Sequence, residues 1–247
     1  DEPQEAEAPP KHTLTITQQF AETELKARFG DKDAQFALGE MYERGQGVIQ
    51  SSSKAKEWNV KAANQGHAAA EYAEGQRLLT NESIPIRQNF SVQWSAWKWL
   101  LKAARQGYAA AQYGVGYMLS EGLCPEPHGQ TAFDWYHKAA AQGYAAAQYS
   151  LGKMYYNGKG ATKNFSMAMD MYLMAANQGH VSATNYIGRM YCIGQGVTQN
   201  YFTAAEWYQK GAAQGDGEAL YALAVLYETG LGVPEDANKA IELYQKA

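Results

Sequence analysis

The octapeptide QGYAAAQY occurs twice in the chain, at Gln106–Tyr113 and at Gln142–Tyr149, and the second copy starts 36 residues after the first. The interval separates four of the five neighbouring pairs in a set of six glycines in the same phase, and 41 residues separate the remaining pair, Gly66 and Gly107. A fixed period of this length is typical of repeat architectures. The sequence therefore predicts six units, with a five-residue insertion in the second, starting near Gly30, Gly66, Gly107, Gly143, Gly179 and Gly215.

Other positions keep the same phase. Each of the six glycines is followed four residues later by Ala, and nine residues later by Gly or, in the last unit, Ala. Further on, each unit has an Ala followed three residues later by a large apolar residue, which places both on one helix face: Trp58, Trp99, Trp135, Met171, Trp207 or Leu243. Between the two sets, four units carry a Gly-x-Gly turn, as in NGKGA at 157–161. Each unit is thus expected to form helix A, a turn, helix B and a return ending in Gly.

A unit such as AAAQYSLGKMYYNGKGATKNFSMAMDMYLMAANQG, at Ala145–Gly179, resembles the Sel1-like repeat, a relative of the tetratricopeptide repeat with a longer turn between its helices. The resemblance covers about residues 31–247. It implies an all-α fold, a right-handed α/α solenoid with helix A on the concave side and helix B on the outer side. Stacking suits the physics as well, because one helix pair cannot bury its apolar face alone.

The two ends of the chain lie outside the repeats. Residues 1–12 are acidic and rich in Pro, which predicts a disordered leader. Residues 13–29, with Leu14, Ile16, Phe20, Leu25 and Phe29, predict a helix that caps the first unit. A start without Met favours a mature chain from which a signal peptide has been removed, and the last unit stops before its closing Gly, so the native chain is free to continue past Ala247.

Composition limits the classes of partner. The net charge is −4, without the basic excess typical of nucleic-acid-binding proteins, so we expect no nucleic-acid partner. The sequence has no run of 18 apolar residues, which predicts no membrane span. Cys124 and Cys192 lack the paired spacing of a zinc site, and we expect free thiols and no metal or cofactor.

Candidate catalytic motifs are few. The SxxK pattern of penicillin-binding enzymes occurs at Ser51–Lys54 and Ser150–Lys153, but without the accompanying SDN or KTG motif. His67 and His180 share one repeat position and are expected to be turn residues. The residues Asn81, Asn89 and Asn164 head glycosylation sequons, which matter only in a secreting eukaryote.

The candidate binding residues lie at positions that differ between units. The resemblance places the positions six, ten and thirteen after each marker glycine on the concave face. Position six is mostly aromatic, and its side chains are expected either to bind or only to pack between units. Positions ten and thirteen supply most of the predicted partner-binding residues: Glu40, Glu43, Gln76, Tyr117, Lys153, Tyr156 and Arg189. Tyr and Arg are common anchors of interfaces.

The second unit departs furthest from the pattern. Its A–B connection at 80–94 loses the Gly-x-Gly turn and gains apolar residues, of which Ile86 and Phe90 are predicted to contact a partner. The alternative is that the loop folds back over its neighbours.

The leading hypothesis is a non-catalytic adaptor that binds another protein through its concave face and the 80–94 loop. Sel1-like proteins serve as adaptors, host-interaction factors and envelope regulators, and some are immunity proteins that neutralise secreted toxins such as phospholipases. An immunity protein is therefore the alternative, and a weak penicillin-interacting hydrolase is a third hypothesis of a different class. We expect a monomer, in the periplasm or exported from a bacterium.

Overall fold

The computed structural model describes residues 14–80, 89–124 and 129–247. Those residues form thirteen α-helices and no strand. The predicted leader at 1–12, Asn81, Ile86 and residues 81–88 of the second-unit loop lie outside the described residues. The helices are α1 (Ile16–Arg28), α2 (Lys32–Arg44), α3 (Ser52–Asn64), α4 (Ala68–Leu79), α5 (Phe90–Arg105), α6 (Ala109–Ser120), α7 (Ala132–Ala141), α8 (Ala145–Asn157), α9 (Phe165–Ala176), α10 (Val181–Ile193), α11 (Tyr201–Ala212), α12 (Gly217–Thr229) and α13 (Ala237–Lys246).

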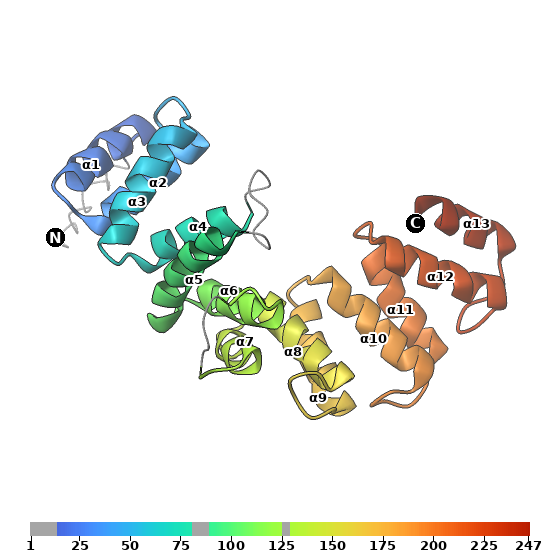
Figure 1. The fold of residues 1–247 in the computed structure, drawn as a ribbon. Coiled ribbons are helices and arrows are strands. Elements are labelled where there is room, and N and C mark those ends of the chain that lie inside the picture. Colours follow the sequence, from blue (N-terminus) through green and yellow to red (C-terminus); the bar gives the residue numbers. More distant parts are fainter. Residues whose placement is uncertain (1–13, 81–88, 125–128) are drawn as a thin grey trace, which may run out of the picture.

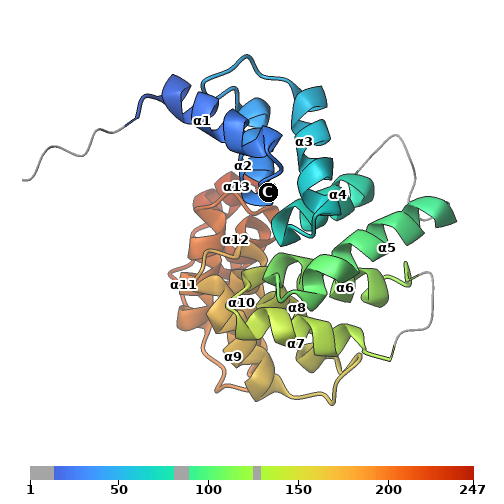
Figure 2. The same ribbon diagram turned by 90° about the vertical axis from the view of Figure 1, so that its left-hand side faces the viewer.

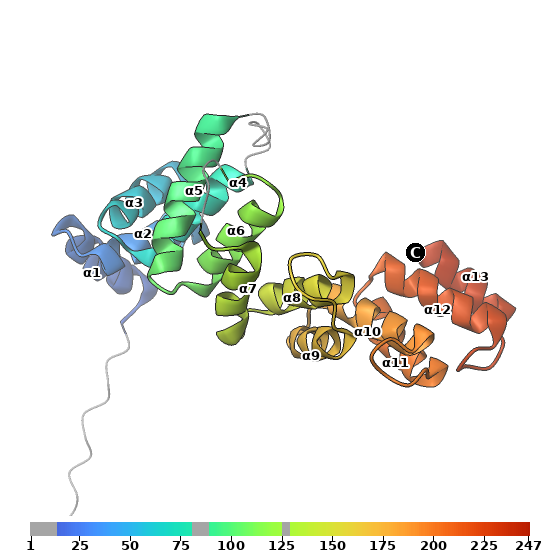
Figure 3. The same ribbon diagram turned by 60° about the horizontal axis from the view of Figure 1, so that its bottom comes forward.

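The helices after α1 form six consecutive pairs, α2–α3 to α12–α13, which are called units one to six below. Each helix packs mainly on the helices before and after it in sequence. The stack is elongated, with the two termini at opposite ends (Figure 1), and it stays extended when the molecule is tilted (Figure 3). Seen along the stack, α2, α4, α6, α8, α10 and α12 form an inner layer, whereas α3, α5, α7, α9 and α11 lie outside them (Figure 2). The predicted all-α solenoid is confirmed.

Helix boundaries follow from capping residues. Each outer helix begins after a side chain that accepts a hydrogen bond from a backbone N–H of the first turn, which satisfies a donor that the helix itself leaves unpaired. These N-caps are Ser51, Asn89, Thr131, Asn164, Asn200 and Asp236. Four inner helices end at a glycine in the left-handed conformation, such as Gly158 with φ 72°, where any other residue would be strained.

The core is built where an inner and an outer helix approach closely. Gly152 on α8 faces the ring of Tyr172 on α9, and a Cβ added at Gly152 would lie 2.6 Å from the Tyr172 ring atoms Cδ1 and Cε1. The same relation holds between Gly116 and Tyr136 and between Gly188 and Tyr208. This contact explains why the ninth position is small in units three to five, where the next helix places a ring across it; in units one and two Asn59 and Leu100 occupy the same place.

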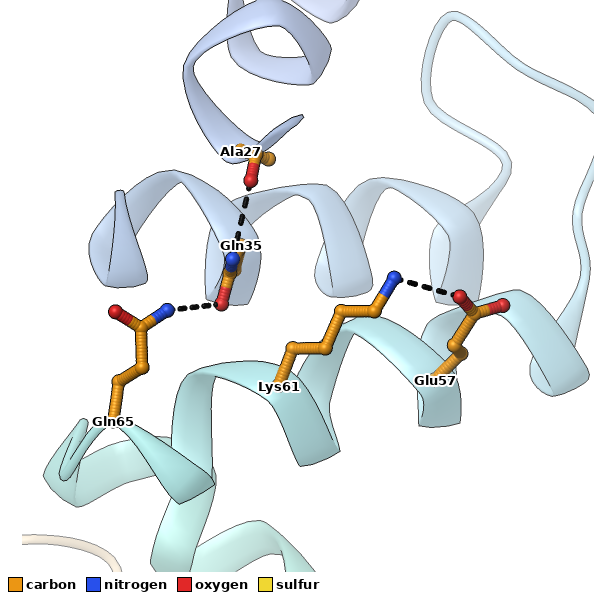
Figure 4. A network of polar contacts seen from close by, with 5 residues as sticks. All are labelled: Ala27, Gln35, Glu57, Lys61 and Gln65. Carbon is orange, nitrogen blue, oxygen red and sulfur yellow. Dashed lines mark hydrogen bonds and ion pairs between the residues drawn. The ribbon is translucent and has the colours of Figure 1, made fainter. Parts of the chain in front are cut away.

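Glutamine side chains join one unit to the next. Gln35 on α2 donates from Nε2 to the carbonyl of Ala27 (3.1 Å), and its Oε1 accepts from Gln65 after α3 (2.7 Å; Figure 4). The nearby ion pair of Lys61 and Glu57 stays on the surface of α3. The same glutamine relay recurs with Gln112 and Gln142, and with Gln148 and Gln178. These buried polar groups are satisfied by one another, so they fix the register of the stack without leaving an unpaired amide.

The helix before the first unit, α1, buries fewer of its apolar residues against unit one than the sequence predicts. Phe20 packs edge-on against Tyr42 of α2, with ring centroids 5.7 Å apart. The small residue Ala27 is buried at the contact, whereas Leu14, Ile16, Leu25 and Phe29 remain exposed. The helix therefore contacts unit one mainly through Phe20 and Ala27, with Ile16 beside Gly47, and leaves most of its other apolar surface exposed.

Candidate functional site

A hollow of the inner layer lies where α6, α8 and the start of α10 meet, and is called the first hollow. It has a volume of about 740 Å³ and is lined mainly by aromatic and polar side chains. Volumes of this size are typical of ligand pockets. The residues used below are Tyr113 and Tyr117 from α6, Tyr136 from α7, Tyr149 and Lys153 from α8, and His180 at the start of α10.

The floor of the first hollow is a group of bonded hydroxyls. The Tyr136 hydroxyl lies 3.0 Å from Oγ of Ser120, and the hydroxyls of Tyr113 and Tyr136 both interact with Ser150. Burial raises the pKa of Tyr136 and of Tyr149 to about 12, because the buried phenolate would lose its hydration. The tyrosines therefore line the hollow as neutral rings with hydrogen-bonding hydroxyls.

The position-six aromatic residues pack between units as well as line the hollow. Each stacks on, or tilts against, the aromatic or histidine N-cap of the next inner helix. The pairs and their centroid distances are Phe36–His67 at 4.5 Å, Tyr72–Tyr108 at 5.3 Å, Tyr113–Tyr144 at 5.3 Å and Tyr149–His180 at 4.4 Å. In unit five the pair is replaced by a hydrogen bond of 2.6 Å from Asn185 to Asp216. The aromatic residues at this position in units one to four thus pack against the next unit, and two of them, Tyr113 and Tyr149, also line the first hollow.

A second hollow adjoins the next unit. It has a volume of about 260 Å³ and is lined by Asn185, Tyr186, Arg189, Tyr208, Glu218 and Ala222. Arg189 is exposed, and its guanidinium carbon lies 6.0 Å from the centre of the Tyr156 ring. Lys153 lines the first hollow from α8, and Arg189 lines the second from α10, the next inner helix.

The structure distributes the other predicted binding residues unevenly. Tyr117 is 39% exposed at the first hollow, and Phe90 is 64% exposed at the start of α5. Tyr156 is only 9% exposed, because the rings of Phe165, Tyr172 and Tyr186 surround it. It supports the inner surface from below and offers little area to a partner.

The acidic end of the predicted groove lies in units one and two. Glu40 forms an ion pair with Arg44 on the same helix (3.2 Å), and Glu43 is exposed beside it. Gln76 is partly exposed on α4. Neither described hollow includes these three residues, so they belong to the same layer as the hollows but not to the same site.

Sequence reasoning missed the contribution of the outer helices to the inner surface. Tyr136 belongs to α7, yet its ring crosses Gly116 and reaches the first hollow. The available signal was the recurrence of Tyr four residues after the small residue of helix B, at Tyr136, Tyr172 and Tyr208. His180 was predicted as a turn residue and does cap α10, but it also lines the hollow.

The two SxxK patterns have structural roles. Ser51 is the N-cap of α3 and accepts from the backbone N–H of Lys54. Ser150 interacts with the Tyr113 and Tyr136 hydroxyls, although both it and Lys153 line the first hollow. The sequons of Asn89 and Asn164 are likewise explained by capping, since the side-chain oxygen of each accepts a backbone N–H.

Histidines and cysteines form no metal centre in the described part of the chain. Nδ1 of His67 accepts from the N–H of Ala70 (3.2 Å), and burial lowers the pKa of both His67 and His180, so that the neutral ring is favoured. Among the described residues no group of three His, Cys, Asp or Glu could hold a metal ion. Cys124 and Cys192 are not joined in a disulfide, and no described helix has the length and apolar character needed to cross a bilayer.

Solved structures share this architecture. A protective antigen of uropathogenic Escherichia coli with an SLR fold is 34% identical, with a TM-score of 0.78 over 92% of this chain. This chain spans only 48% of that antigen. A Sel1 repeat protein from Oxalobacter formigenes is 26% identical, with a TM-score of 0.77 over 95% of this chain and 97% of that one. An immunity protein from Pseudomonas aeruginosa is 19% identical, with a TM-score of 0.52 over 95% and 84% of the two chains, which shows a shared fold alone.

Comparison with curated proteins gave no match. The family model of the Sel1 repeat matches at residues 32–67, 85–108, 109–144, 145–180, 181–216 and 217–247, each match beginning at or near an inner helix except the second, which covers α5. Members of this family are generally non-catalytic scaffolds of the kind that mediates protein–protein interaction. The period, the helix pairs and the family match agree, and the chain belongs to the Sel1 repeat family.

Proposed function

We propose that this chain is a non-catalytic adaptor that binds another protein along the inner layer of units three to five. The observation that carries the proposal is a pair of hollows on the inner layer, one at α6, α8 and the start of α10 and the other between α10 and α12. Their rims expose Tyr117, Lys153 and Arg189, whose residue types are suited to anchoring a partner. The hydroxyls beneath are bonded to one another, so the surface is preorganised before a partner arrives.

The second-unit loop extends the proposed interface. Phe90 and Trp94 at the start of α5 are stacked, with ring centroids 6.5 Å apart, and Phe90 is mostly exposed. An exposed aromatic pair is a common interface anchor. In the proposal these rings contact the same partner as the inner layer, at the edge of the stack.

Photo-crosslinking tests this proposal. A benzophenone amino acid replaces Tyr117 on the inner layer or, as a matched control, Phe202, an exposed aromatic residue of the outer helix α11. Irradiation of the full chain in its native cell should give a defined crosslinked species from position 117 and not from position 202. Crosslinks from position 202 alone would place the interface on the outer layer and contradict the proposal.

The alternative role is that of an immunity protein, for which the shared fold with the Pseudomonas aeruginosa proteins gives a precedent. An immunity protein must hold one toxin tightly, with a dissociation constant on the order of nanomolar or below. The crosslinked partner therefore decides between the roles. A toxic enzyme whose activity the chain inhibits at equal concentration indicates immunity, whereas a non-toxic partner indicates an adaptor.

The proposed location is the periplasm or the outside of a bacterial cell. The likeness to a protective antigen supports an exported chain, because antibodies reach antigens outside the cell. Fractionation of the native cell tests this location. Recovery of the chain from the cytoplasm alone would contradict it.

A further inference from the structure

We infer that the segment gripped by the inner layer is an extended acidic peptide whose carboxylates meet Lys153 and Arg189. This inference rests on the proposed function and names the chemistry of the partner. It begins from the charge distribution of three consecutive inner helices. The helices α6, α8 and α10 contain only two charged residues, Lys153 and Arg189, and both are cations at the tenth position of their units.

Neither cation is neutralised by a described carboxylate. Lys153 lies 5.6 Å from the centre of the Tyr149 ring, and Arg189 lies 6.0 Å from that of Tyr156. By contrast, two arginines of the earlier inner helices, Arg44 of α2 and Arg77 of α4, each form an ion pair with a carboxylate of their own helix. The two inner cations are therefore held over aromatic rings and remain available to an anion from outside.

Acidic residues stand at the margins of this surface. Glu121 follows α6 and lines the first hollow, and Glu218 in the first turn of α12 lines the second. The cation Lys159 also lines the first hollow, so carboxylates of a partner are favoured beside Lys153, Lys159 and Arg189 and disfavoured beside Glu218. This pattern sets the position of the peptide, because like charges repel where they meet.

The spacing of the two cations limits the partner sequence. Neighbouring packed helices lie roughly 8–10 Å apart, and an extended chain advances about 3.3 Å per residue. Two carboxylates two to four residues apart can then reach both cations. An apolar or aromatic side chain beside them can enter the first hollow, where Tyr113, Tyr117 and Tyr149 offer ring faces.

The test uses labelled ten-residue peptides and the full chain. Three matched sets carry Glu, Gln or Lys at two positions spaced by two, three or four residues, with Ala, Leu, Ser or Tyr elsewhere. Binding is followed by fluorescence polarisation at low and at physiological salt. The tightest Glu peptides should bind at least tenfold more tightly than their Gln and Lys counterparts, and the preference should weaken as salt rises.

Matched variants link that preference to the two cations. Lys153→Gln with Arg189→Gln should weaken the best Glu peptide at least tenfold. Lys138→Gln with Lys210→Gln removes two cations of the outer helices, which also lie over aromatic rings, and should leave its affinity unchanged. Equal binding of Glu and Gln peptides, an unchanged affinity in the first variant, or no binding by any peptide would overturn the inference. A crosslink from position 117 to a partner would still support the adaptor role in that case.

Discussion

Units two and four are built from the same kind of helix pair, but unit two buries carboxylates at positions where unit four buries neutral side chains. In unit four, Leu151 of α8 is buried at the eighth position, in an apolar cluster with Tyr136, Ala139, Ala140 and Ala147. In unit two the eighth position is Glu74, only 4% exposed, and its carboxylate accepts two hydrogen bonds from Arg77. The difference shows that the stacking pattern fixes where a residue is buried, but a carboxylate is tolerated there only if a cation comes with it.

The fifth position repeats the contrast. Gln148 in unit four is a neutral member of the glutamine relay, whereas unit two has Glu71, which is 3% exposed and accepts from Gln106 (2.7 Å). Burial raises the pKa of Glu71, and Lys102 and the hydrogen bond from Gln106 oppose that shift. Unit two therefore keeps two buried acids on α4, while unit four keeps the neutral residues Gln148 and Leu151 at the same positions.

The largest change in stability is expected when a carboxylate is placed at the eighth position of unit four. Leu151→Glu buries a carboxylate with Met154, not Arg, at the place that Arg77 has in unit two. We expect a loss of about 3–5 kcal/mol in the free energy of unfolding, measured by urea denaturation. Adding Met154→Arg should restore part of the loss. An unchanged stability in the single variant would show that the eighth position is not a core position.

The reverse exchange should stabilise the chain. Glu74→Leu gives unit two the aliphatic residue of the other units and leaves Arg77 free to turn into solvent. Replacement of a buried ion pair by apolar residues is often neutral or stabilising, by about 1–4 kcal/mol, and we expect a gain within that range by thermal or urea unfolding. Arg77→Leu alone, which leaves Glu74 buried without a cation, is the control and should destabilise the protein.

Tyr172 and Tyr136 allow the contribution of ring packing to stability to be measured separately from that of a hydroxyl hydrogen bond. The Tyr172 hydroxyl is buried without a described hydrogen-bond partner, whereas that of Tyr136 contacts Ser120. Tyr172→Phe should therefore be neutral or stabilising, and Tyr136→Phe should cost about 1 kcal/mol. Denaturation of both variants under the same conditions measures the contrast. Equal losses would indicate that the Tyr172 hydroxyl is hydrogen-bonded in solution.

The smallest effect is a pH dependence in unit two. Because the pKa of Glu71 is raised in the folded state, the folded protein holds this proton more tightly than the unfolded chain. Its contribution to stability is present below the unfolded pKa of 4.5 and is lost as the pH rises through the folded pKa. The Glu71→Gln variant should gain stability relative to the parent as the pH rises from about 4 to 7. A constant difference between the two proteins over that range would contradict this assignment.

The period of the sequence was sufficient to predict the helix pairs, since small residues and turns recur at fixed places, whereas the inner layer was predicted from the resemblance to the Sel1-like repeat. The predicted binding residues Tyr117, Lys153 and Arg189 lie at the two hollows, and Tyr156 proved to be largely buried. The hollows themselves could not be predicted. They depend on Tyr136 reaching across Gly116 from an outer helix, a contact between residues 20 apart. The recurrence of Tyr at this position marks the residue but does not show which surface its ring reaches.

The interface between units five and six limits where whole units can be gained or lost. Elsewhere the contacts between consecutive units are alike, with a ring against a ring or histidine, so a duplicated copy of unit three or four would find compatible neighbours. Asn185 instead requires the aspartate cap of the sixth unit, Asp216. Gain or loss of whole units by recombination is therefore expected to be tolerated in the middle of the array, while units five and six are inherited as a pair.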